Sequence, residues 1–184
     1  MKFYVIRHGQ TDWNVESRLQ GATDVPLNET GIRQAEEARA ALADYPVDLI
    51  VCSTLQRARK TAEILNEAWH CPILYTEALI ERGYGELEGL TVEELKQDPV
   101  KASGVLSSYV ENVRHRGVEP VQTLCGRIGR LLDELRAQHP GKNILLVSHG
   151  AAIRAITWYF TGLREDGTLP SPRLGNCGIR EFEC

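Results

Sequence analysis

Two histidines in this chain each follow a short apolar run and precede a glycine. His8 comes after the run at residues 3–6 and beside Arg7, and His149 ends the run at residues 143–149. A neutral imidazole can act as a nucleophile, and a glycine lets the backbone approach a ligand closely. A single histidine after a strand is often only a polar surface residue, but two in matching surroundings predict one shared site for a small ligand.

An arginine near the start of a helix is the third candidate for chemistry. Arg57 lies in the amphipathic stretch "STLQRARKTAEIL", residues 53–65, which follows an apolar run at residues 47–53. A helix N-terminus together with a guanidinium is a common phosphate site. Arg57 with Arg7, two imidazoles and the amide of Asn14 would match the charge and the several acceptor oxygens of a phosphoryl group.

The apolar runs before these groups predict the strands that position them. Each run is continuously apolar, which is typical of a strand covered on both faces. Stretches with apolar residues at helical spacing alternate with the strands. The alternation predicts a three-layer α/β/α fold with a mostly parallel sheet and helices on both faces. The expected strands are 3–6, 47–53 and 143–149, and the expected helices are 32–42, 55–65, 124–135 and 151–161.

The order of these elements predicts where the candidate groups meet. His8, Ser53 and His149 each stand at the carboxyl end of an expected strand. In open α/β sheets, ligands bind beyond the carboxyl ends of the strands. We therefore expect the three side chains to converge on one edge of the sheet.

Helix ends and two further segments complete the expected fold. Ser53 with Gln56 fits a capping box that opens the second helix, and Gly162 fits a helix end. Residues 91–117 indicate one or two helices outside the alternation, as a small helical cap or lid. Residues 176–184 predict a terminal strand whose direction the sequence leaves open.

The composition is typical of one globular domain, residues 1–184. The formal net charge of -4, from 21 basic and 25 acidic side chains, provides no basic surplus for nucleic-acid binding. No run reaches the roughly 18 apolar residues of a membrane helix, and the first residues lack the features of a signal peptide. We expect a cytoplasmic protein with no nucleic-acid or membrane partner, and the oligomeric state is left open.

The cysteine pattern does not indicate a metal site. The five cysteines are widely spaced, without a C-x-x-C pair or a ligand-like Cys/His spacing, so we expect reduced thiols. A metal hydrolase would use the same histidines and glutamates as ligands, but the flanking arginines would repel a cation. We therefore expect no metal and no cofactor. The cysteines are Cys52, Cys71, Cys125, Cys177 and Cys184.

Several motifs, in order, resemble the histidine phosphatase superfamily, which includes cofactor-dependent phosphoglycerate mutases and many phosphatases. They cover nearly the whole chain. The motifs are Arg7-His8-Gly9 with Thr11 and Asn14, "RLQGATDVPLNETG" (18–31), "CSTLQRARKTAEIL" (52–65), "LIERGYGELEG" (79–89), "LLVSHG" (145–150) and "NCGI" (176–179).

The resemblance implies a role for each phosphate-binding residue. His8 would be the nucleophile that becomes phosphorylated, which divides one difficult displacement into two. Positive groups would stabilise the charge on the phosphoryl oxygens. The residues implied to hold those oxygens are Arg7, Arg57 and His149, with Asn14 assisting and Gly21 offering a backbone N–H. Thr11 has no assigned role.

The resemblance also implies that Glu81 is the proton donor. This group would protonate the leaving alkoxide and then help water to attack the phosphohistidine. We expect Glu81 to be partly buried or near another carboxylate. Glu86 and Glu88 are alternatives that we expect to lie in a solvated loop, and Asp24 is expected to form a turn.

Two departures from the glycolytic mutases favour hydrolysis. The region between Glu81 and His149 is shorter than the resemblance to those mutases would suggest, and Gly83 stands where they tend to have histidine. The sequence thus predicts a phosphomonoesterase that acts on a small phosphorylated metabolite. Phosphoglycerate mutase-type transfer is the alternative. A catalytically weak regulatory module that binds a phospho-ligand is disfavoured, because such a module would lack one of the core residues.

One basic cluster could contact the rest of the substrate. Arg114 and Arg116, in "VRHRG", could clamp a carboxylate or a second phosphate. Basic residues are also what the last turn of a helix before Gly117 predicts. Glu119 lies in "GVEPV", which departs from the Gly-Glu-Ser often seen in the family, and any role for it is in doubt.

Overall fold

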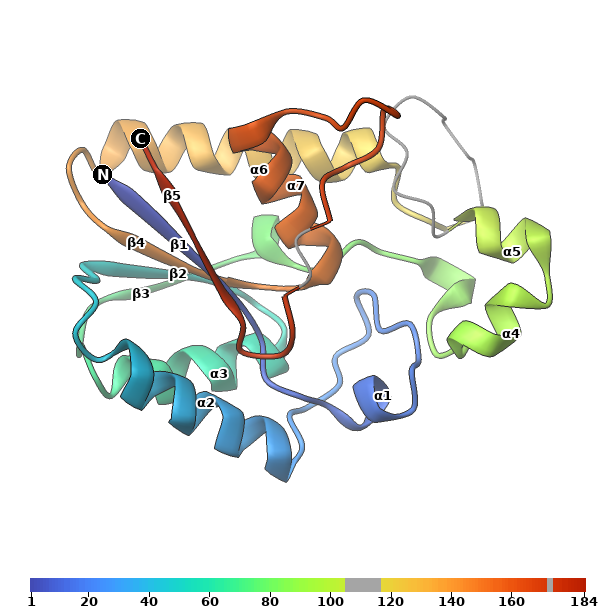
Figure 1. Ribbon diagram of the computed structural model, residues 1–184, viewed down its shortest axis with the longest axis horizontal. Coiled ribbons are helices and arrows are strands. Elements are labelled where there is room, and N and C mark those ends of the chain that lie inside the picture. Colours follow the sequence, from blue (N-terminus) through green and yellow to red (C-terminus); the bar gives the residue numbers. More distant parts are fainter. Residues whose placement is uncertain (105–116, 172–173) are drawn as a thin grey trace.

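A central five-stranded sheet organises the protein, for which the computed structural model describes residues 1–104, 117–171 and 174–184. The strand order is β3-β2-β4-β1-β5, and all neighbours are parallel except β5, which is antiparallel to β1. Figure 1 shows the sheet crossing the molecule, with the two chain ends side by side. The strands are β1 (Lys2–Arg7), β2 (Leu49–Ser53), β3 (Ile73–Thr76), β4 (Ile144–Ser148) and β5 (Ile179–Glu183).

Helices cover both faces of the sheet, as predicted. Helices α2 (Glu29–Leu42) and α3 (Gln56–Asn66) pack on the face of Tyr4 and Ile6, whereas α6 (Val121–Gln138) and α7 (Gly150–Thr161) pack on the opposite face. The two layers lie on opposite sides of the sheet in Figure 1. Because successive strand residues alternate between the faces, a continuously apolar strand fills both cores. The three-layer α/β/α prediction is confirmed.

Strand β3 is missing from the sequence prediction. It forms an edge of the sheet, and the side chains of Leu74 and Tyr75 are exposed. An edge strand that exposes its side chains has no continuous buried run, and the apolar run of β3 is only Ile73, Leu74 and Tyr75, so its signal is weak.

The predicted capping box at Ser53 is wrong. The N-cap of α3 is Leu55, which makes no side-chain cap bond. Ser53 is instead the last residue of β2, and its hydroxyl lies 2.7 Å from Nε2 of His149. The carboxylate of Asp24 accepts the N–H of Gln56 at the start of α3, so Asp24 does more than form a turn.

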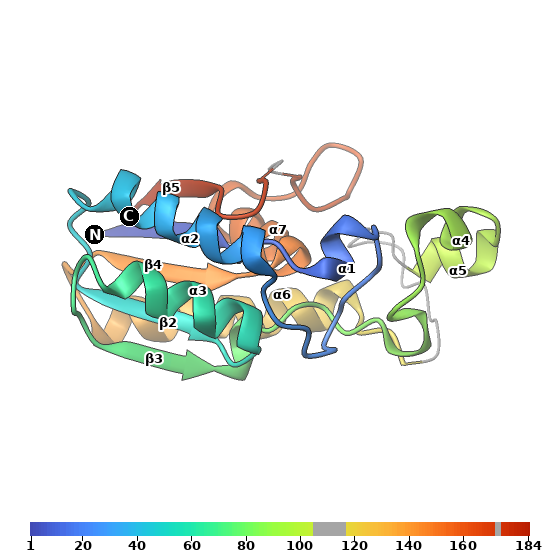
Figure 2. The same ribbon diagram turned by 90° about the horizontal axis from the view of Figure 1, so that it is seen from below.

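Of the predicted cap region, residues 91–117, the structure describes residues 91–104 and 117. Helices α4 (Val92–Lys96) and α5 (Pro99–Gly104) lie beyond α1 (Asp12–Val15), far from the chain ends (Figures 1 and 2). Residues 105–116, which include Arg114 and Arg116, lie outside the described residues.

The remaining helical elements are short, and one predicted helix end is confirmed. Gly162 follows α7 with φ +78°, as the helix-end prediction requires. Within the described ranges no helix is long and apolar enough to cross a membrane. Two short 3₁₀ turns, η1 (Glu77–Leu79) and η2 (Gly85–Leu87), flank the segment that carries Glu81.

Candidate active site

The carboxyl ends of β1 and β4 bring the two histidines together. The register pairs Arg7 with Ser148, and the N–H of His8 donates to the Ser148 carbonyl at 3.0 Å. The centroids of the His8 and His149 rings are 5.1 Å apart, and both side chains are buried. The structure thus places the two groups in one site at the expected edge of the sheet.

The surroundings of His8 determine which ring nitrogen is available. Nδ1 lies 2.7 Å from the carbonyl oxygen of Gly9. Because a carbonyl can only accept, Nδ1 carries the hydrogen and Nε2 has the free lone pair. Burial and the charges of Arg57 and Arg7 hold the pKa of His8 well below its usual value. His8 is therefore neutral near pH 7, as a nucleophile must be.

The ring of His149 is engaged on both sides. Nδ1 accepts from Nε of Arg57 at 3.2 Å, so Nε2 carries the hydrogen and donates to the Ser53 hydroxyl. Burial and the Arg57 charge hold the pKa of His149 well below its usual value. In this arrangement His149 acts on the site through Arg57, and direct contact with a phosphoryl oxygen would require Nε2 to leave Ser53.

Arg57 is fully buried and is held by three acceptors. Besides His149, its Nη1 donates to the carbonyl of Thr23 at 2.7 Å and its Nη2 to the carbonyl of Gly21 at 2.8 Å. Among the described residues, the second hydrogen of each Nη has no acceptor and is available to a ligand. Gly21, expected to offer its N–H, therefore has a second task, because its carbonyl orients the guanidinium.

Glu88 fixes the loop that holds Arg57. Its carboxylate accepts the N–H groups of Ala22 and Thr23 at 3.0 Å and that of Tyr84 at 2.9 Å. The expectation of a solvated Glu88 is therefore wrong, whereas Glu86 is exposed as expected.

Arg7 offers an unpaired donor. Its Nη1 donates to the carbonyl of Leu174 at 3.1 Å, but its buried Nε has no partner within the described residues. Burial lowers the pKa of Arg7, and the charge of Glu81 opposes that shift. A buried guanidinium N–H without a partner indicates a place for an anion.

The amide of Asn14 has a fixed orientation. Its Oδ1 accepts from the N–H and the hydroxyl of Thr11 and from Nδ2 of Asn176, at 3.1, 3.2 and 3.2 Å. Its Nδ2 is therefore the end available to a phosphoryl oxygen. Thr11, which the sequence left unassigned, is the N-cap of α1 and forms a capping box with Asn14.

Sequence reasoning gave no role to Asn176. Its Nδ2 also donates to the carbonyl of His8 at 3.0 Å, so one side chain contacts both the nucleophile's backbone and Asn14. The "NCGI" motif contained the only signal for this contact.

Glu81 docks on the first turn of α7. Its carboxylate accepts the N–H groups of Ala151 and Ala152 at 3.0 to 3.2 Å, and that of Arg82 at 2.9 Å. The side chain is partly buried, as expected. Its charge raises the pKa of both Arg7 and Arg57 against the effect of burial, so it lies within electrostatic range of the two arginines.

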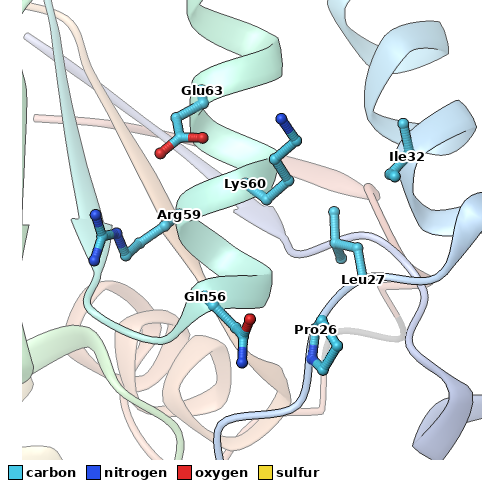
Figure 3. A pocket seen from close by; sticks show the side chains of 7 residues that line it. All are labelled: Pro26, Leu27, Ile32, Gln56, Arg59, Lys60 and Glu63. Atoms are coloured by element: carbon cyan, nitrogen blue, oxygen red, sulfur yellow. The ribbon is translucent and has the colours of Figure 1, made fainter.

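The paired histidines and arginines are separate from any candidate metal group and from a groove elsewhere on the described surface. In the described ranges, no group of three His, Cys, Asp or Glu residues could hold a metal ion, and all five cysteines are free. A groove between α2 and α3 contains none of the predicted site residues (Figure 3). It is lined by Pro26, Leu27, Ile32, Gln56, Arg59, Lys60 and Glu63.

Two buried imidazoles lie at the carboxyl edge of the α/β sheet with the buried guanidinium of Arg57 and the partly buried one of Arg7. This arrangement is the one expected of a phosphate site with a candidate histidine nucleophile. The family model of the histidine phosphatase superfamily (branch 1) matches residues 3–184. The chain belongs to this superfamily.

Among the relatives, some are named as phosphatases and one as a probable mutase. The chain is 38% identical to the uncharacterized phosphatase PhoE of Bacillus subtilis, over 97% of this chain and 86% of that protein. It is 32% identical to the probable phosphoglycerate mutase GpmB of Escherichia coli, over 100% of this chain and 85% of that protein. It also resembles a solved mycobacterial glucosyl-3-phosphoglycerate phosphatase in complex with VO3, with TM-score 0.86 and 29% identity, over 99% and 90% of the two chains.

Proposed function

We propose that the protein is a metal-independent phosphomonoesterase that hydrolyses a small phosphate ester through a phosphohistidine on His8. The observation that carries this proposal is a neutral His8, with the lone pair of Nε2 free, near the buried Arg57 and the partly buried Arg7, whose Nε–H has no partner among the described residues. The names of similar proteins, PhoE among them, support phosphatase chemistry.

The first step transfers the phosphoryl group to the enzyme. The lone pair of His8 Nε2 forms the P–N bond while the ester P–O bond breaks, and Glu81 gives a proton to the leaving oxygen. Arg7 and Arg57 stabilise the charge on the equatorial oxygens, and Nδ2 of Asn14 adds a donor.

The second step restores the enzyme. Water attacks phosphorus as the P–N bond breaks, Glu81 takes the proton from the water, and inorganic phosphate leaves. His8 returns to its neutral form with the hydrogen on Nδ1. The Gly9 carbonyl stabilises that hydrogen throughout, so the same nitrogen remains available for the next cycle.

Hydrolysis of an aryl phosphate in the presence of a chelator tests the activity. We expect turnover that the chelator does not change, and an acid-labile phosphoenzyme after rapid denaturation. No hydrolysis, or a phosphoenzyme that survives acid, would contradict the mechanism.

Phosphoglycerate mutase-type transfer is the second candidate, because GpmB is named a probable mutase. Interconversion of 2- and 3-phosphoglycerate distinguishes the two. We expect inorganic phosphate to form faster than the isomer, and the reverse order would favour the mutase. The natural substrate is proposed only as a small phosphorylated metabolite, so a panel of sugar phosphates, phosphoglycerates and nucleotides would identify its class.

A further inference from the structure

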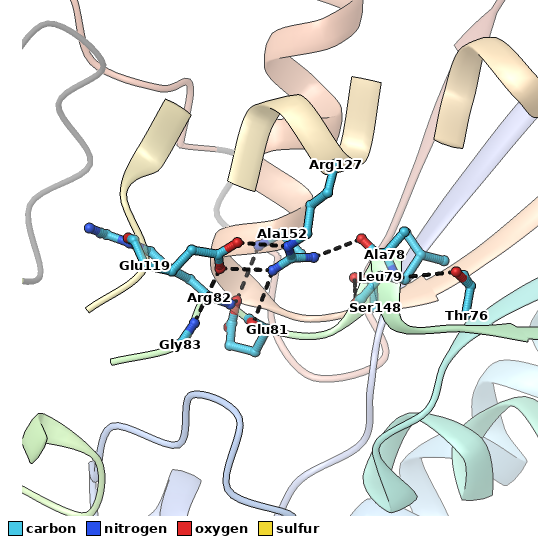
Figure 4. A network of polar contacts seen from close by, with 10 residues as sticks. All are labelled: Thr76, Ala78, Leu79, Glu81, Arg82, Gly83, Glu119, Arg127, Ser148 and Ala152. Atoms are coloured by element: carbon cyan, nitrogen blue, oxygen red, sulfur yellow. Dashed lines mark hydrogen bonds and ion pairs between the residues drawn. The ribbon is translucent and has the colours of Figure 1, made fainter. Parts of the chain in front are cut away.

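An ion pair lies behind the segment that carries Glu81. Arg127, on α6, donates from Nε to Oε1 of Glu119 at 2.8 Å and from Nη2 to Oε2 at 3.0 Å (Figure 4). The exposed fractions of the two side chains are only 15% and 17%. A bidentate, largely buried ion pair of this kind has a defined geometry, unlike most surface ion pairs.

The same arginine also binds the backbone of the acid segment. Its Nη1 donates to the carbonyl of Ala78 at 2.7 Å, and its Nη2 to the carbonyl of Glu81 at 3.2 Å. Four of its five N–H groups are therefore engaged within the protein.

Glu119 holds the other end of this segment. Its N–H donates to the carbonyl of Gly83 at 2.8 Å, and its Oε2 accepts the N–H of Gly83 at 3.3 Å. Its carbonyl accepts from Nε of Arg82 at 2.8 Å. The pair thus contacts residues 78–83 at both ends and at Glu81 itself, as Figure 4 shows.

Glu81 is consequently fixed from two helices. Its carboxylate is held by the N-terminus of α7, and its backbone is held from α6 by Arg127. No hydrogen bond joins Arg127 or Glu119 to Arg7, His8 or Arg57 in the described part of the chain. The contacts of the pair are therefore directed to the acid segment.

We propose that Arg127 and Glu119 form a positioning pair that sets the direction from which Glu81 delivers its proton to the leaving group. This inference rests on the proposed function. It assigns a task to Glu119, whose role was in doubt, and to Arg127, which the sequence did not single out.

A direct contact with substrate is the competing explanation. Arg127 and Glu119 line a hollow with Ala22, Ile80 and Gly83, where part of a substrate could lie. A substrate-binding arginine would chiefly affect the KM of esters whose leaving group is anionic. A positioning arginine instead affects kcat/KM according to how much the leaving group needs a proton.

The experiment compares Arg127→Lys and Glu119→Gln with the wild type on aryl phosphates from good to poor leaving groups, and on alkyl phosphates with and without a carboxylate in the leaving group. Arg130→Lys is the matched control, because Arg130 is an exposed arginine on the same helix. We expect kcat/KM, which reports phosphorylation of the enzyme and not the later attack of water, to fall about tenfold or more for poor leaving groups and less than about twofold for the best one. Glu81→Gln should give the same selectivity, and adding Arg127→Lys to it should cause little further loss, because the two changes affect one step.

The outcomes separate this inference from the proposed function. If the wild-type enzyme forms no acid-labile phosphoenzyme from the aryl phosphate with the best leaving group, both the proposed function and the positioning pair are overturned. If the wild type forms it, equal losses of kcat/KM on all leaving groups, or losses of kcat/KM additive with Glu81→Gln, would overturn the positioning pair alone. A rise in KM confined to anionic leaving groups would also overturn it. Thermal denaturation checks folding, and if Arg127→Lys does not fold, the more conservative Glu119→Gln decides.

Discussion

His8 is held by contacts to its ring and to both of its peptide groups. The ring donates to Gly9, the N–H donates to Ser148, and the carbonyl accepts from Asn176. Each contact restricts a different part of the residue, so the free Nε2 has a defined direction. Preorganisation of this kind lowers the barrier because less reorientation is needed in the transition state.

Replacement of Asn176 tests its part in this arrangement. In Asn176→Ala the donor to the His8 carbonyl and to Asn14 Oδ1 is lost, and in Asn176→Asp a charged acceptor faces two other acceptors. A hydrogen bond contributes about 0.5–1.5 kcal/mol, so loss of two should lower kcat about tenfold, with Asn176→Asp worse. Steady-state kinetics on an aryl phosphate measures this. Equal kcat values for Asn176→Asp and wild type would exclude the role.

Among the segments, the loop at residues 20–24 determines where Arg57 lies. Two of its carbonyls accept from the guanidinium, while Glu88 accepts two of its N–H groups. Gly21 has φ +53°, and a Cβ there would lie 2.1 Å from Oε1 of Glu88. The loop therefore requires glycine for both backbone conformation and space.

Gly21→Ala should weaken the binding of phosphate analogues. The added methyl group displaces Glu88 and with it the carbonyls that orient Arg57, so we expect the inhibition constant of vanadate to rise about tenfold or more. Gly141→Ala is the control, because Gly141 has φ +78° but nothing within 4 Å of an added Cβ. That control should lose about 1–2 kcal/mol of stability through backbone strain and keep its vanadate affinity. Equal vanadate affinity in the two variants would contradict the role of the loop.

The sequence predicted a strand correctly where the strand is buried on both faces and therefore continuously apolar. Continuous apolar runs predicted β1, β2 and β4, since strands buried on both faces leave no polar positions. The prediction of a capping box at Ser53 was wrong because the Ser53 hydroxyl bonds to His149, which is 96 positions away in sequence. Local patterns contain no information about such a partner.

The same reason limits what the sequence revealed about the site. Motifs at strand ends located His8 and Arg57, because parallel strands bring their carboxyl ends to one edge. Asn176, Glu88 and Arg127 act largely through backbone N–H and carbonyl groups of distant segments. Every residue has these backbone groups, so the sequence does not show which of them a side chain will reach.

For the chain as a whole, two buried neutral histidines make stability depend on pH. The pKa values of His8 and His149 are held well below their usual value in the folded protein. As the pH falls below about 6.5, the usual histidine pKa, the unfolded chain binds protons before the folded protein does. The contribution of the two histidines to the free energy of unfolding is therefore present above that pH and is lost as the pH falls below it. The slope is at most about 1.4 kcal/mol per pH unit for each histidine.

Urea denaturation at pH 7.5 and pH 5.5 measures this dependence. We expect the free energy of unfolding to fall less between these pH values in His8→Asn than in the wild type. His70→Asn serves as control, because His70 is exposed and asparagine tolerates its positive φ of 50°. An equal fall in wild type and His8→Asn would show that His8 is not buried in its neutral form.

Location of the phosphoryl group on the quenched enzyme tests the central claim most directly. Enzyme mixed with an aryl phosphate, denatured in alkali within milliseconds and digested, should contain a phosphoryl group on His8, stable in alkali and lost in acid. Mass spectrometry of the His8 and His149 peptides, with His8→Asn as control, would show it. Phosphate on His149, or on no histidine during continuing turnover, would contradict the assignment of His8 as nucleophile.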